Sequence, residues 1–268
     1  MRISLQLFPK KQDTCVPINY QYPLSAAIYK ILQKASPQYA SFLHDKGYPA
    51  PSGRLMKLFT FSRLWIPHVR IHRNVLRGGK GPWRLQLGSP MLDEFVQNFV
   101  LGLFESTVIT IGSQGVHAEF RVEQVEALPT PEFQDITRCK SLSPITASTM
   151  IETEDRPQIY YYRPEDFGLS EALRQNILQK YEIVYGTKPE DEQLTFSLDK
   201  TDNPRSRLIR IKEGTTEETQ IKAFETYFTL TGNPQLMQTA WECGLGEHNS
   251  QGFGMVEVVS REKLIVNS

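Results

Sequence analysis

The chain has 268 residues and 40% of them are hydrophobic, which is enough for two compact domains with their own cores. Its 17 glycines and 17 prolines follow no collagen-like period, and no apolar run reaches the roughly 18 to 20 residues that span a bilayer, so disordered, fibrous and membrane-spanning classes are excluded. No secretory signal is visible at the N-terminus, and we expect a cytoplasmic protein. Cys15, Cys139 and Cys243 are too few and too far apart for a disulfide framework or a zinc knuckle, and are expected to be reduced packing residues.

The formal net charge of zero conceals an asymmetry between two parts of the chain. Residues 1–90 contain 14 Lys and Arg against 2 Asp and Glu, whereas residues 91–268 contain 16 against 28. Such asymmetry is typical of a protein that binds a polyanion on its basic part. The alternative is that the two parts neutralise each other across an interface, and composition leaves both open.

The first half alternates between strand and helix patterns. Alternating side chains predict a strand over residues 2–8, and apolar residues at helical spacing after Pro23 predict a helix. A short helix is expected over residues 37–46, ended by Gly47. The remaining elements are strands at 55–64, 68–76 and 83–87, a helix at 90–104, and strands at 108–111 and 116–128.

Residues 68–76 and 83–87 are expected to pair as a hairpin, because the turn-rich residues 77–82 connect them. Alternation would then direct one face, including Val69 and Ile71, toward a core and leave a basic face outside. A basic face of this kind holds phosphates, although a merely solvated surface is the alternative. The candidate RNA-binding residues here are Arg70, His72, Arg73, Arg77, Lys80 and Arg84.

Strand, helix, strand, strand, helix, strand is the order of a ferredoxin-like domain. A proline-bearing linker follows at residues 128–132. The second half predicts strands at 143–150 and 159–162, a helix at 164–185, a hairpin of 193–198 with 208–212, a strand at 221–230, a helix at 234–243 and a strand at 254–259. We therefore predict an α+β protein with two tandem ferredoxin-like (RRM-like) domains, over residues 1–128 and 129–268.

A glycine-rich string near the C-terminus is the most specific motif of the chain. It consists of Gly244-Leu-Gly246, five further residues, and Gly252-Phe-Gly254. Such glycines indicate backbone with positive φ or a close approach to a ligand, and their N–H groups can hold phosphate oxygens. The string is neither a Walker A loop nor a dinucleotide fingerprint, and its glycines alone also fit a tight connection.

This string resembles the glycine-rich motif of the CRISPR-associated endoribonucleases that cut precursor CRISPR RNA, members of the repeat-associated mysterious protein (RAMP) superfamily. Residues 19–29, 40–44 and 57–61 are similar to the opening segments of that family, in the same order. The resemblance implies two tandem ferredoxin-like domains and cleavage within the CRISPR repeat without a metal or other cofactor. In that reaction a ribose 2′-OH attacks the adjacent phosphate and leaves a 2′,3′-cyclic phosphate and a 5′-OH.

The resemblance also implies catalytic roles for Tyr29, His44 and Lys57. His44 is the expected proton-transfer group, because an ordinary imidazole pKa of about 6.5 allows it to act as acid or base near neutrality. Lys57 would stabilise the charge on the phosphorane, and Tyr29 would position groups or share in proton transfer. Structural roles are the alternatives: a helix-end histidine, a lysine lying along an apolar strand face, and a core tyrosine.

The chain departs from the family between the two glycine pairs, where a Lys or Arg is usual and residues 247–251 contain neither. Phosphate binding by this loop would depend on His248 and on the amides of Gly244, Gly246, Gly252 and Gly254. We therefore expect tighter RNA binding at pH 6 than at pH 8.

Two other classes of enzyme do not fit the sequence. The two-histidine phosphodiesterases need a pair of His-x-Thr/Ser motifs, which the chain lacks, and Asp13 and Asp45 are too few carboxylates in the basic part for a two-metal site. The main alternative is a non-catalytic protein that binds CRISPR repeat RNA, followed by a sequence-independent RNA binder. The expected partner is the CRISPR repeat RNA of the precursor transcript, with no membrane; a CRISPR effector complex and a homodimer stay open.

Overall fold

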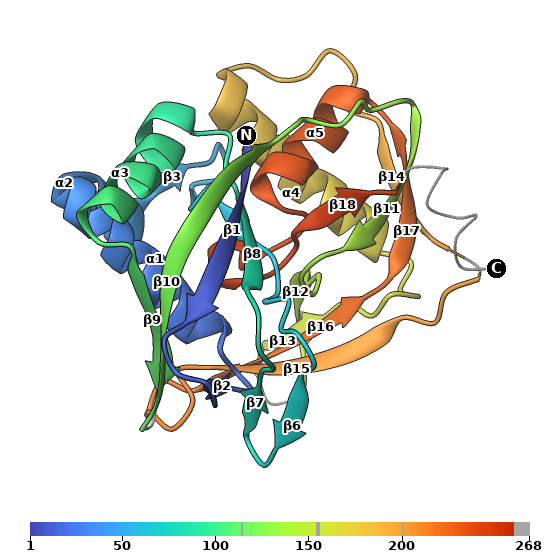
Figure 1. Ribbon diagram of the computed structural model, residues 1–268. Coiled ribbons are helices and arrows are strands. Elements are labelled where there is room, and N and C mark those ends of the chain that lie inside the picture. The colour runs from blue at the N-terminus through green and yellow to red at the C-terminus, as the bar shows by residue number, and fades with distance from the viewer. Residues whose placement is uncertain (114, 154–155, 200, 260–268) are drawn as a thin grey trace.

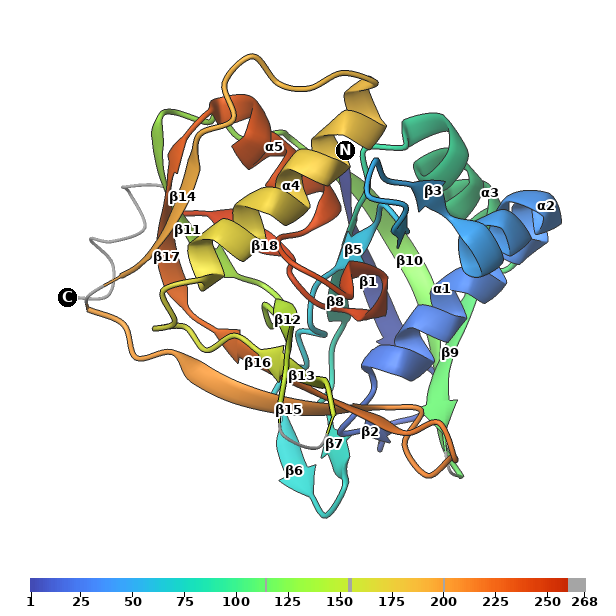
Figure 2. The same cartoon turned by 180° about the vertical axis from the view of Figure 1, so that it is seen from behind.

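The computed structural model describes residues 1–113, 115–153, 156–199 and 201–259. Figure 1 shows two sheets side by side, each with helices packed against it. Figure 2 gives the opposite view, in which α4 of the second half and α1 of the first lie in front of their sheets. None of the helices in the described ranges is long and apolar enough to cross a membrane.

The first half is built around a five-stranded antiparallel sheet with the strand order β5-β8-β1-β10-β9. Its elements are β1 (Arg2–Pro9), β2 (Cys15–Pro17), α1 (Gln21–Ala35), α2 (Pro37–Ser41), η1 (Phe42–Lys46), β3 (Tyr48–Pro49), β4 (Leu55–Met56), β5 (Thr60–Phe61), β6 (Arg70–His72), β7 (Val75–Arg77), β8 (Trp83–Gly88), η2 (Leu92–Gln97), α3 (Asn98–Glu105), β9 (Val108–Ser113) and β10 (Val116–Leu128). Alternate residues Ile3, Leu5 and Leu7 place β1 in the middle, because all three are buried in one core with α1 and α3.

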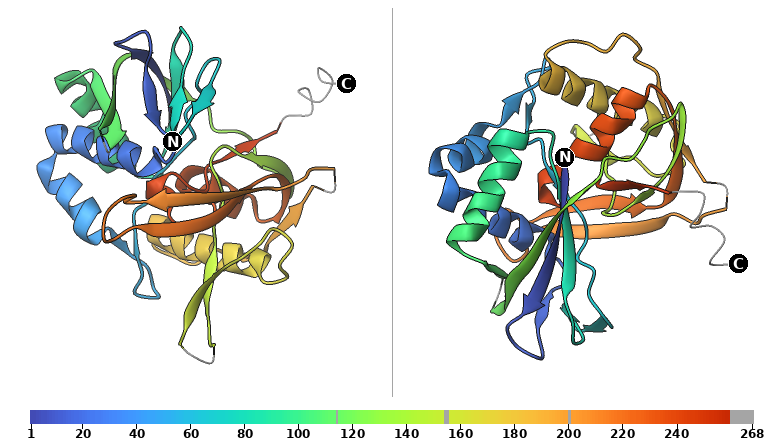
Figure 3. Two further views of the ribbon diagram at one scale, coloured as in Figure 1. Left: turned by 90° about the horizontal axis from the view of Figure 1, so that it is seen from below. Right: turned by 45° about the horizontal axis from the view of Figure 1, so that its top comes forward.

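The second half repeats this arrangement with the strand order β14-β17-β11-β18. Its elements are β11 (Ile136–Ser141), β12 (Ser148–Ile151), β13 (Gln158–Tyr161), α4 (Leu169–Tyr185), β14 (Leu194–Leu198), β15 (Arg205–Ile211), β16 (Thr219–Glu225), β17 (Tyr227–Gly232), α5 (Pro234–Cys243), η3 (Asn249–Gln251) and β18 (Val256–Val258). The β12–β13 and β15–β16 hairpins are insertions into this unit, and both lie outside its sheet (Figure 3).

These two topologies confirm the predicted fold class. In each half a strand, helix, strand, strand, helix and strand follow one another, and the first strand of this pattern lies between the third and the fourth. In the first half β10 is the fourth strand of the pattern, and β9 is an additional edge strand. The largest core is formed by residues between Ile3 and Val122, and the next by residues between Cys139 and Val256. This separation supports the division of the chain after residue 128, which we keep as a proposal. The cysteines are free, and Cys139 and Cys243 are buried.

The hairpin predicted between residues 68–76 and 83–87 is wrong. Residues 68–76 turn back on themselves, because Arg73 adopts a positive φ of 52° and β6 pairs with β7 across residues 73 and 74. Strand β8 instead pairs with β1 and β5 in the first sheet. As a result Val69 and Ile71, expected in a core, are 51% and 68% exposed.

Two strand predictions in the second half also need correction. The predicted hairpin of 193–198 with 208–212 does not form, because β14 pairs with β17 and β15 pairs with β16. The run 221–230 is two strands with different partners, separated at Thr226, whose amide donates to the hydroxyl of Ser141. Strand β11, one of the two inner strands of its sheet, was not predicted, because only its Cys139 and Thr137 are buried and so short an alternation of apolar and polar residues is a weak signal.

Candidate active site and RNA-binding surfaces

His44 lies in η1, a single π-helical turn after α2. Its side chain is 71% exposed, and its Nδ1 lies 2.9 Å from Oδ1 of Asp45. Ser41 donates a hydrogen bond of 2.9 Å to the other carboxylate oxygen, and the contacts with His44 and Ser41 hold the pKa of Asp45 below its usual value. Because an ionised carboxylate only accepts hydrogen bonds, Nδ1 of His44 carries a proton and Nε2 remains for proton transfer.

Lys57 reaches the same place from the end of β4. Its Nζ donates a hydrogen bond to the backbone carbonyl of His44. The approach depends on Gly47, which has a φ of 74° and whose added Cβ would lie 2.6 Å from the carbonyl oxygen of Met56. Lys57 is half-buried, and burial lowers its pKa, although the Asp45 carboxylate opposes this effect.

Tyr29, on α1, completes the group. Its ring meets that of His44 edge to face, with 5.5 Å between the ring centroids, and meets Phe59 at 5.7 Å. Burial raises the pKa of Tyr29 above its usual value, and the nearby side chain of Ser250 offsets this only in part. The phenol is therefore neutral near pH 7, and its oxygen is enclosed without a hydrogen-bond partner among the described residues. The structure brings together Tyr29, His44 and Lys57, which the sequence analysis singled out.

The glycine-rich string forms the loop between α5 and β18. All four glycines have a positive φ, between 74° and 89°. The buried Lys180 of α4 holds this loop, since its Nζ donates to the carbonyl oxygens of Gly244 (2.6 Å) and Gly246 (2.8 Å) and to Oδ1 of Asn249 (2.7 Å). The loop also contacts the helix that carries Tyr29, because Ser25 donates a hydrogen bond of 2.6 Å to the carbonyl of Ser250.

Most of the glycine amides are engaged within the protein. The amides of Gly244, Gly252 and Gly254 donate to the carbonyl oxygens of Ala240 (3.0 Å), Asn249 (3.0 Å) and Pro144 (2.8 Å). The expectation that these three amides are free for phosphate is therefore wrong, and their glycines serve the geometry of the loop. The exposed His248 has its Nδ1 3.0 Å from Oε1 of Gln251. RNA contact by His248 and Gly246 stays a prediction.

The basic candidates are gathered mainly on the β6–β7 hairpin, which projects at the lower edge in Figure 1. All six predicted side chains are exposed, and none makes an ion pair with a carboxylate of the described residues. Arg70 and His72 lie on β6, Arg77 on β7, Arg73 in the turn and Lys80 after the hairpin; Arg84 lies apart, on β8. The strand pairing therefore differs from the predicted one, but the predicted basic side chains are still exposed.

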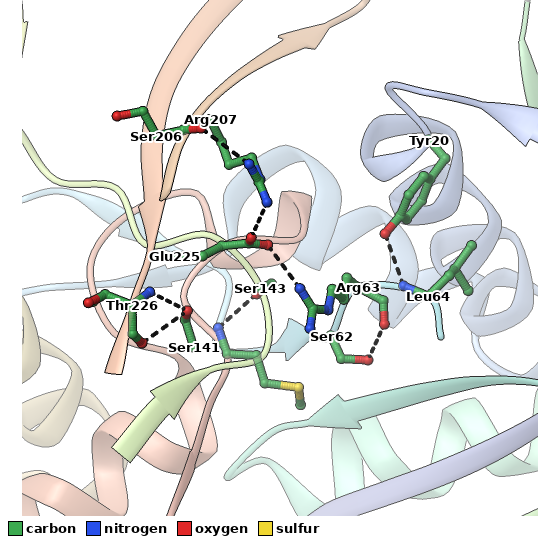
Figure 4. A network of polar contacts seen from close by, with 11 residues as sticks. Tyr20, Ser62, Arg63, Leu64, Ser141, Ser143, Ser206, Arg207, Glu225 and Thr226 are labelled. Carbon is green, nitrogen blue, oxygen red and sulfur yellow. Dashed lines mark hydrogen bonds and ion pairs between the residues drawn. The ribbon is translucent and has the colours of Figure 1, made fainter. Parts of the chain in front are cut away.

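Other basic residues of the first half pair with carboxylates of the second. Glu225 accepts from Arg207 at 2.6 Å and from Arg63 at 3.4 Å, in the polar network of Figure 4. Arg54 pairs with Glu247, and the N-terminal amine pairs with Glu242, each at 3.1 Å. Neutralisation between the halves therefore applies to some of the charges. Binding of a polyanion by the hairpin cations stays a prediction.

The sequence analysis did not identify Asp45, Asn249 and Lys180 as parts of this site. A signal existed for Lys180, a lysine on the apolar face of a helix whose Leu173, Ile177 and Tyr181 are buried. For Asp45 the only signal was its position next to His44 and four residues after Ser41.

Two family models cover nearly the whole chain. The model described as CRISPR-associated protein Cas6, N-terminal, matches residues 15–126, and the model described as CRISPR associated protein Cas6, C-terminal, matches residues 128–258. The chain belongs to the Cas6 family. The resemblance that the glycine-rich string and the three N-terminal segments indicate is thereby confirmed.

Similarity to individual Cas6 proteins supports the same family. The chain is 36% identical to CRISPR-associated endoribonuclease Cas6 1 of Methanocaldococcus jannaschii over 96% of this chain and 92% of that one. It is 28% identical to CRISPR-associated endoribonuclease Cas6 of Pyrococcus furiosus, over 96% and 90%. A solved structure described as CRISPR associated protein Cas6 has a TM-score of 0.75 at 34% identity, covering 97% of this chain and 99% of that one. A Cas6-related protein from Pyrococcus furiosus, at 24% identity and the same coverages, has a TM-score of 0.80 and supports the fold.

Proposed function

We propose that this Cas6 protein cuts CRISPR repeat RNA in the precursor transcript by attack of a ribose 2′-OH on the adjacent phosphate, without a metal ion. The endoribonuclease class follows from the family, since the Cas6 relatives from Methanocaldococcus jannaschii and Pyrococcus furiosus are named endoribonucleases. The observation that carries the chemistry is the contact of Lys57 and Tyr29 with His44, which itself is paired with Asp45.

This group of residues matches the needs of the reaction. Attack by the 2′-OH needs a base, departure of the 5′-oxygen needs an acid, and the phosphorane needs positive charge. The exposed imidazole of His44 can take or give a proton at Nε2, with Asp45 fixing its tautomer at Nδ1. The Lys57 ammonium would supply the charge, and Tyr29, whose ring packs edge to face against the imidazole, would position His44.

The exposed cations of the β6–β7 hairpin would hold RNA phosphates and set its position, without reading sequence. His248 of the glycine-rich loop lines the same cavity as Lys57. An RNA strand that contacts the cavity would pass the proposed catalytic group. The cytoplasmic location, a homodimer and an effector complex remain predictions from the sequence.

The direct test is cleavage of the repeat RNA in EDTA by the wild type and by His44→Ala. We expect the wild type to cut and to leave a 2′,3′-cyclic phosphate, and the variant to be slower by about 10²- to 10⁴-fold, the usual contribution of general acid–base catalysis. His117→Ala, which removes an exposed histidine on β10, is the matched control and should cut normally. Tight binding by the wild type with no cleavage would favour the alternative of a non-catalytic binder of repeat RNA.

A further inference from the structure

A cavity of about 480 Å³ lies beside the proposed catalytic group. It is lined by residues 54–58 of the first half and, from the second half, by the glycine-rich loop, α4 and the β12–β13 hairpin. Its volume lies within the roughly 300–1,000 Å³ range of small-ligand sites. Because Lys57 lines it, a group that enters this cavity contacts one of the three residues of the proposed catalytic group.

A pair of opposite charges marks the cavity wall. Arg54 donates to Oε1 of Glu247 at 3.1 Å, and Ser148 donates to Oε2 at 2.7 Å. The Glu247 side chain is only 16% exposed, whereas that of Arg54 is 62% exposed. A carboxylate oxygen can accept more than one hydrogen bond, so Glu247 retains acceptor capacity toward a ligand, and Arg54 retains unused N–H donors.

Asn176 of α4 also lines the cavity, but its Oδ1 is enclosed and is not open to a ligand. The acceptors of the cavity wall are therefore the two oxygens of the Glu247 carboxylate, and the neighbouring donor is Arg54.

We propose that this cavity binds a guanine base of the nucleotide attached to the scissile phosphate. The Watson–Crick edge of guanine carries two neighbouring donors, N1–H and the 2-amino group, beside the acceptor O6. Adenine and cytosine present one amino group beside ring acceptors, and uracil presents a single N–H between two carbonyls, so each leaves an acceptor of the cavity unmatched. This inference rests on the proposed function for the identity of the ligand as RNA, and on the cavity for the base.

The test measures binding of single nucleotides to the full chain by titration calorimetry. The probes are the 3′- and 5′-monophosphates of guanosine, adenosine, cytidine and uridine. We expect one of the two guanosine monophosphates to bind about tenfold or more tightly than its counterparts with other bases, in line with the discrimination of a bidentate base contact. The preferred isomer then shows whether the base belongs to the nucleotide before or after the cut.

Two further measurements separate base recognition from general effects. Inosine monophosphate lacks only the 2-amino group, so with the unaltered protein it should bind about tenfold more weakly than its guanosine counterpart. Glu247→Gln should remove the preference for guanine, whereas Glu190→Gln, an exposed control, should keep it. Equal binding of all four bases, or equal binding of guanosine and inosine monophosphates, would overturn the proposal.

The proposed guanine site and the proposed cleavage chemistry can be tested separately. His44→Ala should retain the guanine preference, because His44 does not line the cavity. Loss of cleavage with a retained guanine preference contradicts only the proposed catalytic function. Normal cleavage by a protein that binds all four nucleotides equally contradicts only the guanine site.

Discussion

His44 carries out its proposed role as part of a pair with Asp45. The imidazole is largely exposed, and two contacts orient it: the edge-to-face packing of the Tyr29 ring and the hydrogen bond from Nδ1 to Asp45. Sequence analysis could identify Tyr29, His44 and Lys57, because these types at these places resemble the family. It could not identify Asp45, because a carboxylate next to a histidine contacts it only in particular backbone geometries, here a π-helical turn.

Asp45→Asn tests this pair. An amide can face Nδ1 with its N–H group and so favour the tautomer that has its proton on Nε2, which cannot act as a base there. We expect the rate constant for cleavage to fall by about 10- to 100-fold while the Kd for repeat RNA stays the same. Single-turnover kinetics measure the rate. Ser41→Ala, which removes one hydrogen bond to Asp45, should have a smaller effect; an unchanged rate in Asp45→Asn would argue against a positioning role.

The second prediction concerns Lys57 and the pH dependence of the cleavage rate. Burial lowers its pKa, so its positive charge is lost at a lower pH than that of an ordinary lysine, and stabilisation of the phosphorane decreases as the pH rises through that value. The cleavage rate of the wild type should therefore fall on the alkaline side. In Lys57→Arg the charge persists, and that fall should disappear from the pH–rate profile. Identical alkaline limbs in both proteins would contradict the assignment.

At the scale of elements, the sequence predicted the sheet strands β1, β8 and β10 and the helices α1, α4 and α5, because each has a clear period of apolar residues. The sequence did not predict which strands pair with one another. Alternation shows which side chains share a face, but it does not show that residues 68–76 fold back on themselves at Arg73. The exposed Val69 and Ile71 have alternation typical of a half-buried strand, yet no core lies beneath them.

Lys180 links α4 to the glycine-rich loop, and its burial gives a prediction about stability. Burial lowers its pKa from 10.5 to about 8. Between these values the unfolded chain keeps a proton that the folded protein has released, so the free energy of unfolding should rise with pH, by about 3 kcal/mol from this one group. Urea denaturation at pH 8 and at pH 10 measures the rise. In Lys180→Met the rise should be smaller by this amount, whereas the exposed control Lys188→Met should match the wild type; equal pH dependence in all three proteins would show that Lys180 does not titrate there.

At the scale of the whole molecule, the basic residues fall into two groups. Arg54 and Arg63 connect the halves through Glu247 and Glu225, whereas the β6–β7 hairpin presents cations without carboxylate partners in the described part of the chain. Composition alone could show the asymmetry but not this division, because it depends on which charges the fold brings within contact.

The hairpin cations should make RNA binding strongly dependent on salt. Replacing Arg70, Arg73, Arg77 and Lys80 together by Gln should weaken binding of repeat RNA and reduce the slope of log K against log salt by about 3, if each contacts one phosphate. A salt titration of the wild type and this variant measures both slopes. Lys188→Gln, far from the hairpin in sequence and on the second half, is the control; a wild-type slope near zero would show that phosphate contacts do not dominate affinity.

In the proposed reaction a ribose 2′-OH of the RNA, activated at His44, is the nucleophile. The most direct measurement compares cleavage of the repeat RNA with cleavage of the same RNA carrying a single 2′-deoxy sugar immediately upstream of the cut, both in EDTA. We predict that the all-ribose RNA is cut, and that the substituted RNA binds with the same Kd and is not cut. Cleavage of the 2′-deoxy RNA at the same position would contradict this mechanism, because the nucleophile would then have to be water.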